Sequence, residues 1–222
     1  MLNSEQQRAV EHQDGPLLVI AGAGSGKTRV VTTRICHLIE KGGDPSQILG
    51  LTFTNKAAQE MRERVRSLMQ AQVMISTFHS LGAFILRESI GVLGYTRSFT
   101  IYDEEDVMKL LKGLVKELEL SLAAADVKSI RHRISQAKNA LISPEECAKE
   151  RAVRPSDRVF PTLYAHYQER LKTANAVDFD DLIGETVRIF KEHPQVTEYY
   201  RRRFRHVLID EYQDTNHAQY VL

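Results

Sequence analysis

A glycine-rich segment near the N-terminus constrains this chain more than any other feature. Residues 21–28 read AGAGSGKT and lie between an apolar run at 17–20 and a helical pattern that starts at Gly26. Glycines let the backbone turn tightly and approach an anion without a Cβ clash. The N-terminus of the following helix directs N–H groups and the positive end of its dipole at the same place. The segment therefore predicts a phosphate-binding loop between a strand and a helix.

The chemistry of such a loop assigns roles to its members. Lys27 is expected to reach the β- and γ-phosphates of a nucleotide, and the Thr28 hydroxyl is expected to ligate Mg²⁺. The usual pattern begins with glycine where this chain has Ala21, which we interpret as a variant of the loop. The predicted nucleotide-binding residues of the loop are Gly22, Ala23, Gly24, Ser25, Gly26, Lys27 and Thr28.

The order of the predicted elements indicates an α/β fold with a parallel sheet. Apolar runs at 17–20, 48–53 and 73–76 are predicted strands, and helical patterns at 26–41 and 55–69 alternate with them. A β-α-β-α-β order favours right-handed crossovers between parallel strands. The first run is apolar throughout, which is typical of a strand covered on both faces, so we expect residues 17–20 to be buried.

The middle of the chain, from about 80 to 195, has a different texture. Apolar residues recur at helical spacing after Asp103, which is a predicted N-cap. Further helical patterns lie near 126–141, 161–174 and 179–191. These patterns predict an all-helical insertion within the α/β domain.

The strand pattern returns only at 207–209, which sets the predicted domain boundaries. We assign residues 1–82 and 191–222 to an ATP-binding domain and residues 83–190 to an inserted helical subdomain.

Two acids follow directly after the strand predicted at 207–209. Ligands of parallel sheets bind beyond the carboxyl ends of the strands, so these acids are expected beside the phosphates. Asp210 is predicted to hold Mg²⁺, through water or directly, and Glu211 to orient and deprotonate the attacking water. The pair is a weak signal alone and gains its meaning from the phosphate-binding loop upstream.

Composition excludes several classes of protein. The 222 residues carry a formal net charge of +1, so any nucleic-acid surface must come from local patches. The two cysteines, Cys36 and Cys147, lack a CxxC spacing, which argues against a zinc site or a disulfide framework. The sequence has neither a long apolar run nor the apolar segment of a signal peptide. We expect a cytoplasmic protein that does not contact membranes.

Five segments together resemble the UvrD/Rep (PcrA-like) family of superfamily 1 DNA helicases. Besides the phosphate-binding loop they are DEYQDTN at 210–216, TFTNKAA at 52–58, STFH at 76–79 and LNSEQ at 2–6, in the order of the family. The resemblance covers essentially the whole chain. It implies a RecA-like P-loop NTPase sheet with an inserted helical subdomain, and an ATP-dependent DNA helicase as the intact protein.

The resemblance also implies roles for single residues. Gln6 would read the adenine edge of ATP, and Arg29 would lie near the nucleotide. Gln213 would link the hydrolysis site to the DNA-binding elements, completing a catalytic set with Lys27, Asp210 and Glu211. The implied contacts to single-stranded DNA are Phe53, Thr54, Asn55, Thr77, Phe78 and His79.

From the residues alone, this DNA surface has a competing interpretation. Aromatic rings beside small polar groups at strand ends suit base stacking and phosphate binding. Phe53 and Phe78 are explained at least as well as core residues.

Two basic runs are open in the same way, between a DNA contact and a solvated or internally paired helix face. They are Lys128, Arg131, Arg133 and Lys138, and Arg201, Arg202, Arg203 and Arg205. We interpret Asp178 in the nearby VDFDDL segment as a helix cap without a catalytic role.

In the family, the sequence continues beyond the DEYQDTN box with a second motor domain, whose arginines complete the ATP site. We therefore expect this chain to bind ATP, hydrolyse it poorly and not unwind DNA by itself. The expected partners are that second motor domain, single-stranded DNA, single-strand/duplex junctions, and repair or replication proteins. The family resemblance implies 3′ to 5′ movement of the intact protein in DNA repair or replication restart.

Three alternatives stay open at the level of sequence. A P-loop NTPase or kinase unrelated to nucleic acid leaves the TFTNKAA and STFH segments unexplained. A non-catalytic nucleotide-dependent binding module fits the chain as given, without a second motor domain, whereas Glu211 argues against it for the intact protein. A helicase fused to a nuclease domain is a variant that this sequence does not test.

Overall fold

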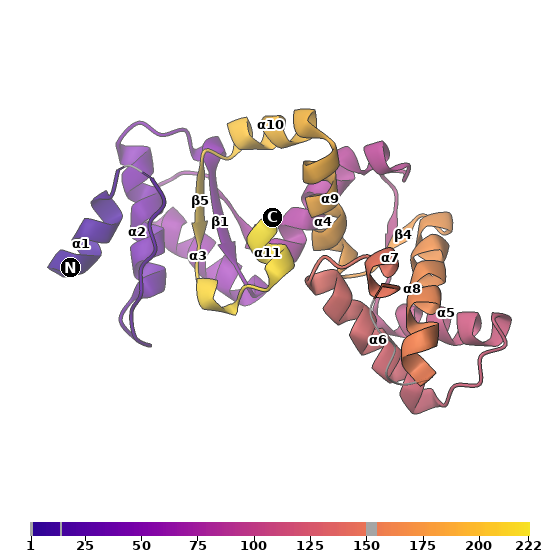
Figure 1. The fold of residues 1–222 in the computed structure, drawn as a ribbon. Helices are drawn as coiled ribbons and strands as arrows, with labels where there is room; N and C mark the ends of the chain where they lie inside the picture. The colour runs from indigo at the N-terminus through magenta and orange to yellow at the C-terminus, as the bar shows by residue number, and fades with distance from the viewer. Residues whose placement is uncertain (1, 14, 150–154) are drawn as a thin grey trace. The chain divides into compact units, whose positions relative to one another are not determined.

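The computed structural model describes residues 2–13, 15–149 and 155–222 (Figure 1). Within the described residues, no helix is long and apolar enough to cross a membrane.

The chain folds into two compact units, each built from separate parts of the sequence. The first unit comprises Met1–Leu81 and Thr197–Asp214, and the second comprises Gly82–Val196 and Thr215–Leu222. Residues 191–196 and 215–222, which the sequence assigns to the ATP-binding domain, group with the second unit. The helix within 215–222 packs on two helices of that unit, and Asn216 donates a hydrogen bond of 2.6 Å from Nδ2 to Asn139 Oδ1.

The first unit is an α/β structure with a three-stranded parallel sheet in the order β2-β1-β5. The predicted strands at 48–53, 73–76 and 207–209 and the predicted helices at 26–41 and 55–69 are confirmed, with small shifts at their ends. Its elements are α1 (Ser4–Glu11), α2 (Lys27–Glu40), η1 (Pro45–Gln47), β1 (Ile48–Thr52), α3 (Asn55–Leu68), β2 (Met74–Thr77), β5 (His206–Ile209) and η3 (Tyr212–Asp214). The boundaries between the units fall within α4 (Phe78–Ser89), within α10 (Pro194–Arg203) and directly after η3.

β1 is the centre of this sheet, and all five of its residues are buried. It lies between β2 and β5, so both of its edges carry parallel ladders. Ile48 of β1 and Ile75 of β2 form a cluster with Ile35 of α2 and with Met61 and Val65 of α3. Complete burial of such side chains contributes about 1.5–3 kcal/mol each, and the burial fixes the helices on the sheet.

The prediction of a buried strand at 17–20 is wrong. These residues form no strand, and their side chains are between 41% and 89% exposed. A strand requires a neighbour that satisfies its N–H and C=O groups. Among the described residues, β5 pairs only with β1, so its other edge carries no ladder. The apolar pattern shows that residues 17–20 are hydrophobic, but it does not show whether a neighbouring strand is available to pair with them.

The second unit is mostly helical, as predicted, but it also contains a short parallel pair of strands, so the expectation of an all-helical subdomain is corrected. Thr100 and Ile101 of β3 pair with Ala176 and Val177 of β4. Its elements are η2 (Ile90–Leu93), β3 (Thr100–Ile101), α5 (Glu104–Glu117), α6 (Ala124–Asn139), α7 (Pro144–Cys147), α8 (Pro155–Thr173), β4 (Ala176–Val177), α9 (Asp181–Glu192) and α11 (His217–Val221).

Local capping explains where several of these helices begin. Asp103 is the N-cap of α5 as predicted, and its side chain accepts a hydrogen bond of 2.9 Å from Asp106 N. The predicted helices near 126–141, 161–174 and 179–191 correspond to α6, α8 and α9. α8 begins six residues earlier than predicted, and Pro161 lies inside it.

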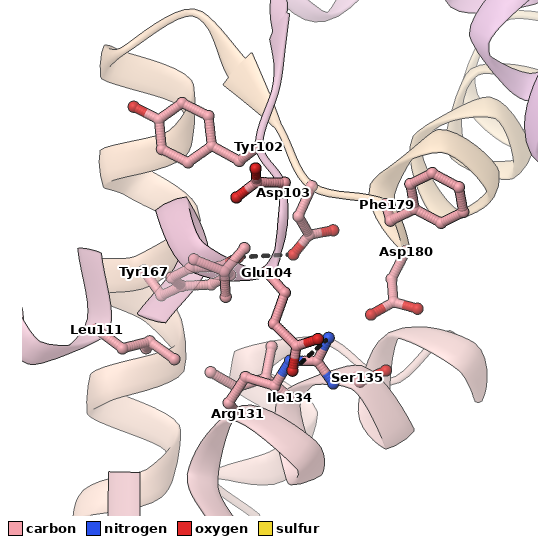
Figure 2. A pocket seen from close by; sticks show the side chains of 12 residues that line it. Tyr102, Asp103, Glu104, Leu111, Arg131, Ile134, Ser135, Tyr167, Phe179 and Asp180 are labelled. Carbon is pink, nitrogen blue, oxygen red and sulfur yellow. Dashed lines mark hydrogen bonds and ion pairs between the residues drawn. The ribbon is translucent and has the colours of Figure 1, made fainter. Parts of the chain in front are cut away.

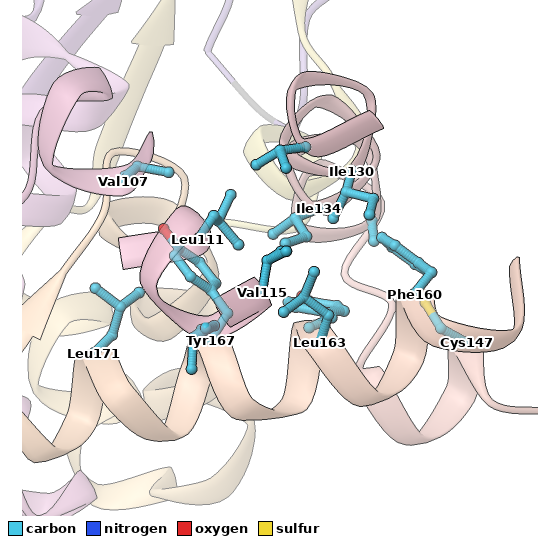
Figure 3. Packing of buried hydrophobic residues seen from close by; sticks show 14 of the residues in the cluster. Val107, Leu111, Val115, Ile130, Ile134, Cys147, Phe160, Leu163, Tyr167 and Leu171 are labelled. Carbon is cyan, nitrogen blue, oxygen red and sulfur yellow. The ribbon is translucent and has the colours of Figure 1, made fainter. Parts of the chain in front are cut away.

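The core of the second unit forms where α5, α6 and α8 meet (Figure 3). Leu111 of α5, Ile130 and Ile134 of α6, and Leu163 and Tyr167 of α8 are all buried. Their spacing of three and four residues within each helix places them on one face. The periodicity after Asp103 predicted the apolar face that α5 contributes to this core.

A buried ion-pair network joins α6 to the start of α9. Lys138 Nζ lies 2.6 Å from Asp178 Oδ2 and 2.7 Å from Asp181 Oδ1. The Tyr167 hydroxyl donates a further hydrogen bond of 2.7 Å to Asp178 Oδ2. Burial alone lowers the pKa of Lys138, but the charges of Asp178 and Asp181 outweigh it and raise that pKa above its usual value. The ammonium group therefore stays charged inside the core.

This network settles the role of two features from the sequence. Asp178 Oδ1 accepts a hydrogen bond of 2.9 Å from Asp181 N, so its side chain caps the first N–H of α9, although the N-cap position itself is Asp180. In the basic run at 128–138, Lys138 is buried, Arg133 is paired with Asp157 at 2.9 Å, and Arg131 lies 3.9 Å from Glu104. Internal pairing therefore accounts for most of the run.

Removing the buried cation should destabilise the second unit strongly. Lys138→Met leaves two buried carboxylates without their partner, so we expect the free energy of unfolding to fall by about 3–5 kcal/mol. Lys128→Met is the matched control, because Lys128 is exposed on the same helix. Urea denaturation followed by circular dichroism measures both variants. Equal stabilities of the two variants would contradict this account of the network.

Candidate nucleotide-binding site

The backbone of the phosphate-binding loop adopts conformations that favour glycine. Gly24 has a φ of 73° and Gly26 a φ of 87°, and Gly26 directly precedes α2 as its N-cap. An L-residue in this region costs roughly 1–2 kcal/mol. Ala21 is not among the residues with positive φ, which explains why this position of the loop accepts a methyl group.

Two side chains of the loop bind its own backbone. Lys27 Nζ donates to the carbonyl oxygens of Ala21 at 3.1 Å and Gly22 at 3.2 Å. Ser25 Oγ donates to the Gly22 carbonyl oxygen at 2.7 Å. These bonds hold the ammonium group over the loop, where the backbone N–H groups and the N-terminus of α2 also direct positive charge.

Gln6 ties helix α1 to the same loop. Its Oε1 accepts a hydrogen bond of 2.9 Å from Asn3 N, and its Nε2 donates one of 2.8 Å to the carbonyl oxygen of Ser25. The Asn3 side chain caps the Gln6 N–H in return, which completes a capping box at the start of α1. A primary amide has two donors and two acceptor lone pairs, so Gln6 keeps one of each for a ligand.

The two halves of the candidate site meet at Thr28 and Asp210. Thr28 Oγ1 donates a hydrogen bond of 2.7 Å to Asp210 Oδ2, across 182 positions of sequence. Asp210 is buried at the end of β5, and its N–H bonds the Leu51 carbonyl oxygen at 2.9 Å. The sheet therefore fixes this carboxylate beside the first turn of α2.

The oxygen atoms of Thr28 and Asp210 fit a magnesium ion. Mg²⁺ prefers hard oxygen ligands and is usually bound by one or two carboxylates together with substrate phosphates and waters. The described residues contain no group of three or more histidine, cysteine, aspartate or glutamate side chains that would hold a metal by themselves. A hydroxyl and a carboxylate supply only part of the octahedral shell of Mg²⁺, so the site fits an ion shared with a phosphate ligand.

Glu211 occupies an unusual backbone conformation next to this pair. Its φ of 54° lies in the left-handed region, which is uncommon for a residue with a side chain and is often found at functional sites. Gln213 Nε2 donates a hydrogen bond to the Glu211 carboxylate. Asp214 N donates one of 3.0 Å to the Glu211 carbonyl oxygen, which closes the turn η3. Both the backbone and the carboxylate of Glu211 are therefore held.

Arg34 is a structural residue that sequence reasoning missed. Its guanidinium donates from Nη1 to the carbonyl oxygens of Ala9 at 3.1 Å, Val10 at 2.9 Å and His12 at 2.7 Å. These carbonyls lie at the C-terminal end of α1, where a cation is favourable. The only signal in the sequence was an arginine within the helix that follows the loop. Arg29, the predicted nucleotide contact on the same helix, is exposed.

Some of the predicted DNA contacts are accessible at the carboxyl ends of β1 and β2. Thr54 and Asn55 are exposed just after β1, and Thr54 Oγ1 caps α3 by accepting a hydrogen bond of 3.1 Å from Ala57 N. His79 is half-buried in the first turn of α4. These residues lie at the same edge of the sheet as Asp210, because all three strands are parallel.

Phe78 and Thr77 do not fit the expectation of a DNA contact. Phe78 is only 2% exposed, and its ring packs on the half-buried ring of Phe53 with 5.5 Å between the centroids. Thr77 is buried, and its hydroxyl is bonded to Ser80 Oγ at 2.9 Å. The core interpretation is therefore correct for Phe78, because burial removes its ring from any base.

The second unit contains a separate pocket of about 300 Å³ (Figure 2). Carboxylates from Asp103, Glu104, Asp178 and Asp180 line it, but each already has a role in the protein. Asp103 and Asp178 are helix caps, Glu104 lies near Arg131, and Asp180 Oδ1 accepts a hydrogen bond of 3.0 Å from Asn139 Nδ2. This pocket accordingly offers no catalytic group to the candidate site.

Comparison with known proteins gives a consistent family. Residues 2–222 match the family described as UvrD/REP helicase N-terminal domain. The chain is 49% identical to ATP-dependent DNA helicase UvrD1 of Mycobacterium tuberculosis over 228 residues, which cover 100% of this chain and 30% of the relative. It is 49% identical to ATP-dependent DNA helicase PcrA of Bacillus subtilis, with the same coverage, and 45% identical to PcrA of Staphylococcus aureus, with 31% of that relative covered. The chain thus spans about 30% of the length of these relatives.

The loop glycines provide a test of the backbone geometry. Gly26→Ala should lower the free energy of unfolding by about 1–2 kcal/mol, because the alanine would have to adopt a left-handed backbone conformation. Its Cβ would also lie 3.1 Å from Gln6 Nε2. Gly22→Ala is the matched control, since Gly22 has no positive φ and its added Cβ would meet nothing within 4 Å. Thermal and urea denaturation of both variants measures the difference. A Gly26→Ala protein as stable as the control would rule out this loop conformation.

Proposed function

Because this chain belongs to the UvrD/Rep helicase family, we propose that it is the ATP-binding portion of an ATP-dependent DNA helicase or translocase. The observation that carries the proposal is the hydrogen bond of 2.7 Å between Thr28 and Asp210. It brings the threonine of the phosphate-binding loop to the aspartate at the end of β5, which is the arrangement needed for a nucleotide with its metal.

Each residue of the site has a separate task in this proposal. Lys27 binds the β- and γ-phosphates by exchanging its two carbonyl partners for phosphate oxygens. Thr28 and Asp210 hold Mg²⁺, which would neutralise charge on the phosphates. Glu211 orients the attacking water and accepts its proton. Gln6 reads the adenine edge with the donor and the acceptor that its other hydrogen bonds leave open.

Gln213 is proposed to couple hydrolysis to DNA. Its hydrogen bond to the Glu211 carboxylate gives it direct influence on the orientation of the catalytic base. Asp210 N is bonded to Leu51 O of β1, and Thr54 and Asn55 follow at the end of the same strand. A shift of DNA at Thr54 and Asn55 therefore has a short route to the nucleotide site, through the backbone of β1 and one hydrogen bond.

Single-stranded DNA is the proposed substrate of this edge of the sheet. Phe53, Thr54, Asn55 and His79 supply the contacts, and Phe78 supports the ring of Phe53 from below. Bases have a π-face whatever their identity, so such contacts tolerate any sequence. We assign 3′ to 5′ translocation and a role at single-strand/duplex junctions in DNA repair or replication restart on the family relationship.

The domain arrangement of the intact helicase is part of the same proposal. The first unit, Met1–Leu81 and Thr197–Asp214, is proposed to be a RecA-like motor domain, and the second unit is proposed to be a helical subdomain inserted into it. A second motor domain contributes arginines to the ATP site, which stabilise charge in the transition state. Closure of two such domains on ATP and reopening after hydrolysis would move the protein along DNA.

Nucleotide binding tests the phosphate-binding loop directly. Lys27→Ala should weaken the binding of a fluorescent ATP analogue in the presence of Mg²⁺ by at least about tenfold, because a charge-assisted contact to the phosphates is lost. Lys41→Ala is the control, since Lys41 is an exposed lysine at the other end of α2. If Lys27→Ala binds the analogue like the control, the assignment of the loop is wrong.

Glu211→Gln separates binding from hydrolysis. The variant should bind ATP like the unchanged chain but hydrolyse it about 100-fold more slowly in single-turnover measurements, because an amide cannot accept the proton. Glu40→Gln, an exposed substitution on α2, serves as the control. Hydrolysis that persists in Glu211→Gln would exclude Glu211 as the base. Hydrolysis that single-stranded DNA does not change would favour a P-loop NTPase without a nucleic-acid substrate.

A further inference from the structure

An open groove of about 610 Å³ lies where the strands of the first unit's sheet begin, opposite the nucleotide site. Gln47, Gln72, Tyr199, Arg202, Arg203 and Phe204 are among the residues that line it, and none of the lining residues is acidic. No part of the proposed helicase chemistry uses this groove. It also contains half of the basic run at 201–205, which the sequence left open.

Strand polarity places the groove away from the candidate nucleotide and DNA contacts. Gln47 precedes β1, Gln72 precedes β2, and Phe204 precedes β5, whereas Asp210 and Thr54 follow the strands. In a parallel sheet, residues that precede the strands and residues that follow them lie at opposite ends of the strands. A strand of five residues spans about 16 Å, so a ligand in the groove has contacts of its own.

One aromatic ring in the groove is held in place without being covered. Tyr199 is 55% exposed. The buried ring of Tyr200 supports it edge-on, with 5.0 Å between the centroids and an interplanar angle of 82°. Arg203 Nη1 donates a hydrogen bond of 3.3 Å to the Tyr199 hydroxyl. A fixed ring with an open face is suited to stacking, because little conformational freedom is lost on binding.

The charges around this ring are available to an anion. The Arg202 side chain is 79% exposed, and its Nε lies 2.7 Å from Glu198 Oε1 in a surface ion pair. Such exposed pairs contribute little to stability, so a phosphate can replace the glutamate. Arg201 and Arg205 are also exposed, and no ion pair of either is found among the described residues. Stabilising the C-terminus of α10 explains one or two of these arginines but not the open tyrosine beside them.

We propose that this groove is a second contact site for single-stranded DNA, with Tyr199 stacking on a base and Arg202 and its neighbours binding phosphates. The inference rests on the proposed function for its partner but on different residues for its contacts. An acidic peptide would use the arginines without using the exposed ring face. A DNA duplex hides its base faces inside the stack, which favours a single strand.

Fluorescence anisotropy with a labelled oligothymidylate and the 222-residue chain tests the aromatic part. Tyr199→Ala should weaken binding at least about fivefold, within the range expected for a lost base stack. Tyr199→Phe should bind like the unchanged chain, because the ring remains. Tyr220→Ala removes another exposed tyrosine and is the matched control. A Tyr199→Ala protein that binds like Tyr220→Ala overturns the proposal.

The salt dependence of binding tests the arginine. The slope of log affinity against log salt is negative, and Arg202→Ala should reduce its magnitude by about 0.7, the value for one phosphate contact on a single strand. Lys109→Ala is the matched control, since Lys109 is an exposed cation in an i,i+4 pair with Glu105 at 3.3 Å. If Arg202→Ala and Lys109→Ala change the slope equally, net charge alone explains the change, and the proposal is overturned.

Two further measurements separate this inference from the proposed function. Poly-glutamate should compete with the oligonucleotide poorly, and competition as strong as that of unlabelled DNA would identify an acidic-peptide groove instead. Asn55→Ala tests the DNA contacts at the other edge of the sheet. If Asn55→Ala weakens DNA binding and Tyr199→Ala does not, the groove assignment fails while the proposed function stands. If the unchanged chain binds no DNA, the proposed DNA substrate itself fails.

Discussion

The hydrogen bond between Thr28 and Asp210 depends on a pairing between strands that are far apart in the sequence. Asp210 reaches the phosphate-binding loop only because β5 pairs in register with β1, from Ile48 and His206 to Leu51 and Ile209. Between β2 and β5 the chain runs through the whole first segment of the second unit, Gly82–Val196. Such non-local pairings form late and slowly in folding, because loop-closure entropy opposes them. The candidate site therefore exists only once the sheet of the first unit is complete.

The second unit depends on a buried ion-pair network instead of a pairing between distant strands. Its core is ordinary helix packing, but Lys138, Asp178 and Asp181 form a charged centre inside it. Replacing such a network by apolar groups is often neutral, whereas removing one partner is costly. The network thus specifies how α6 meets the start of α9 more than it adds stability. The carboxyl group of Asp181 experiences opposing effects in this network. Burial and the neighbouring Asp178 raise its pKa, while Lys138 opposes that rise.

The sequence predicted most features that depend on local chemistry but missed several that depend on distant partners. The cap at Asp103 and the helix that follows Gly26 need only neighbouring residues, and both are found. The run at 17–20 looked like a strand, but its ladder partner is not encoded in its own pattern. Phe78 stood in a motif that resembled a DNA contact, yet its environment is set by Phe53 and the core. The contacts of Gln6 and Arg34 with backbone carbonyls were likewise invisible, because any polar helix position could have made them.

The DNA contacts that we propose depend on where the exposed cations of this nearly neutral chain lie. A formal net charge of +1 gives no general attraction, so exposed cations must be concentrated locally. Most of the basic residues in the run at 128–138 are engaged in internal pairs, and Lys138 is buried. In the run at 201–205 the arginines stay at the surface or half-buried beside Tyr199, with one exposed glutamate pair. Two runs that look equivalent in sequence are thus separated by burial, and only the second has both the open charge and the aromatic surface that a single strand requires.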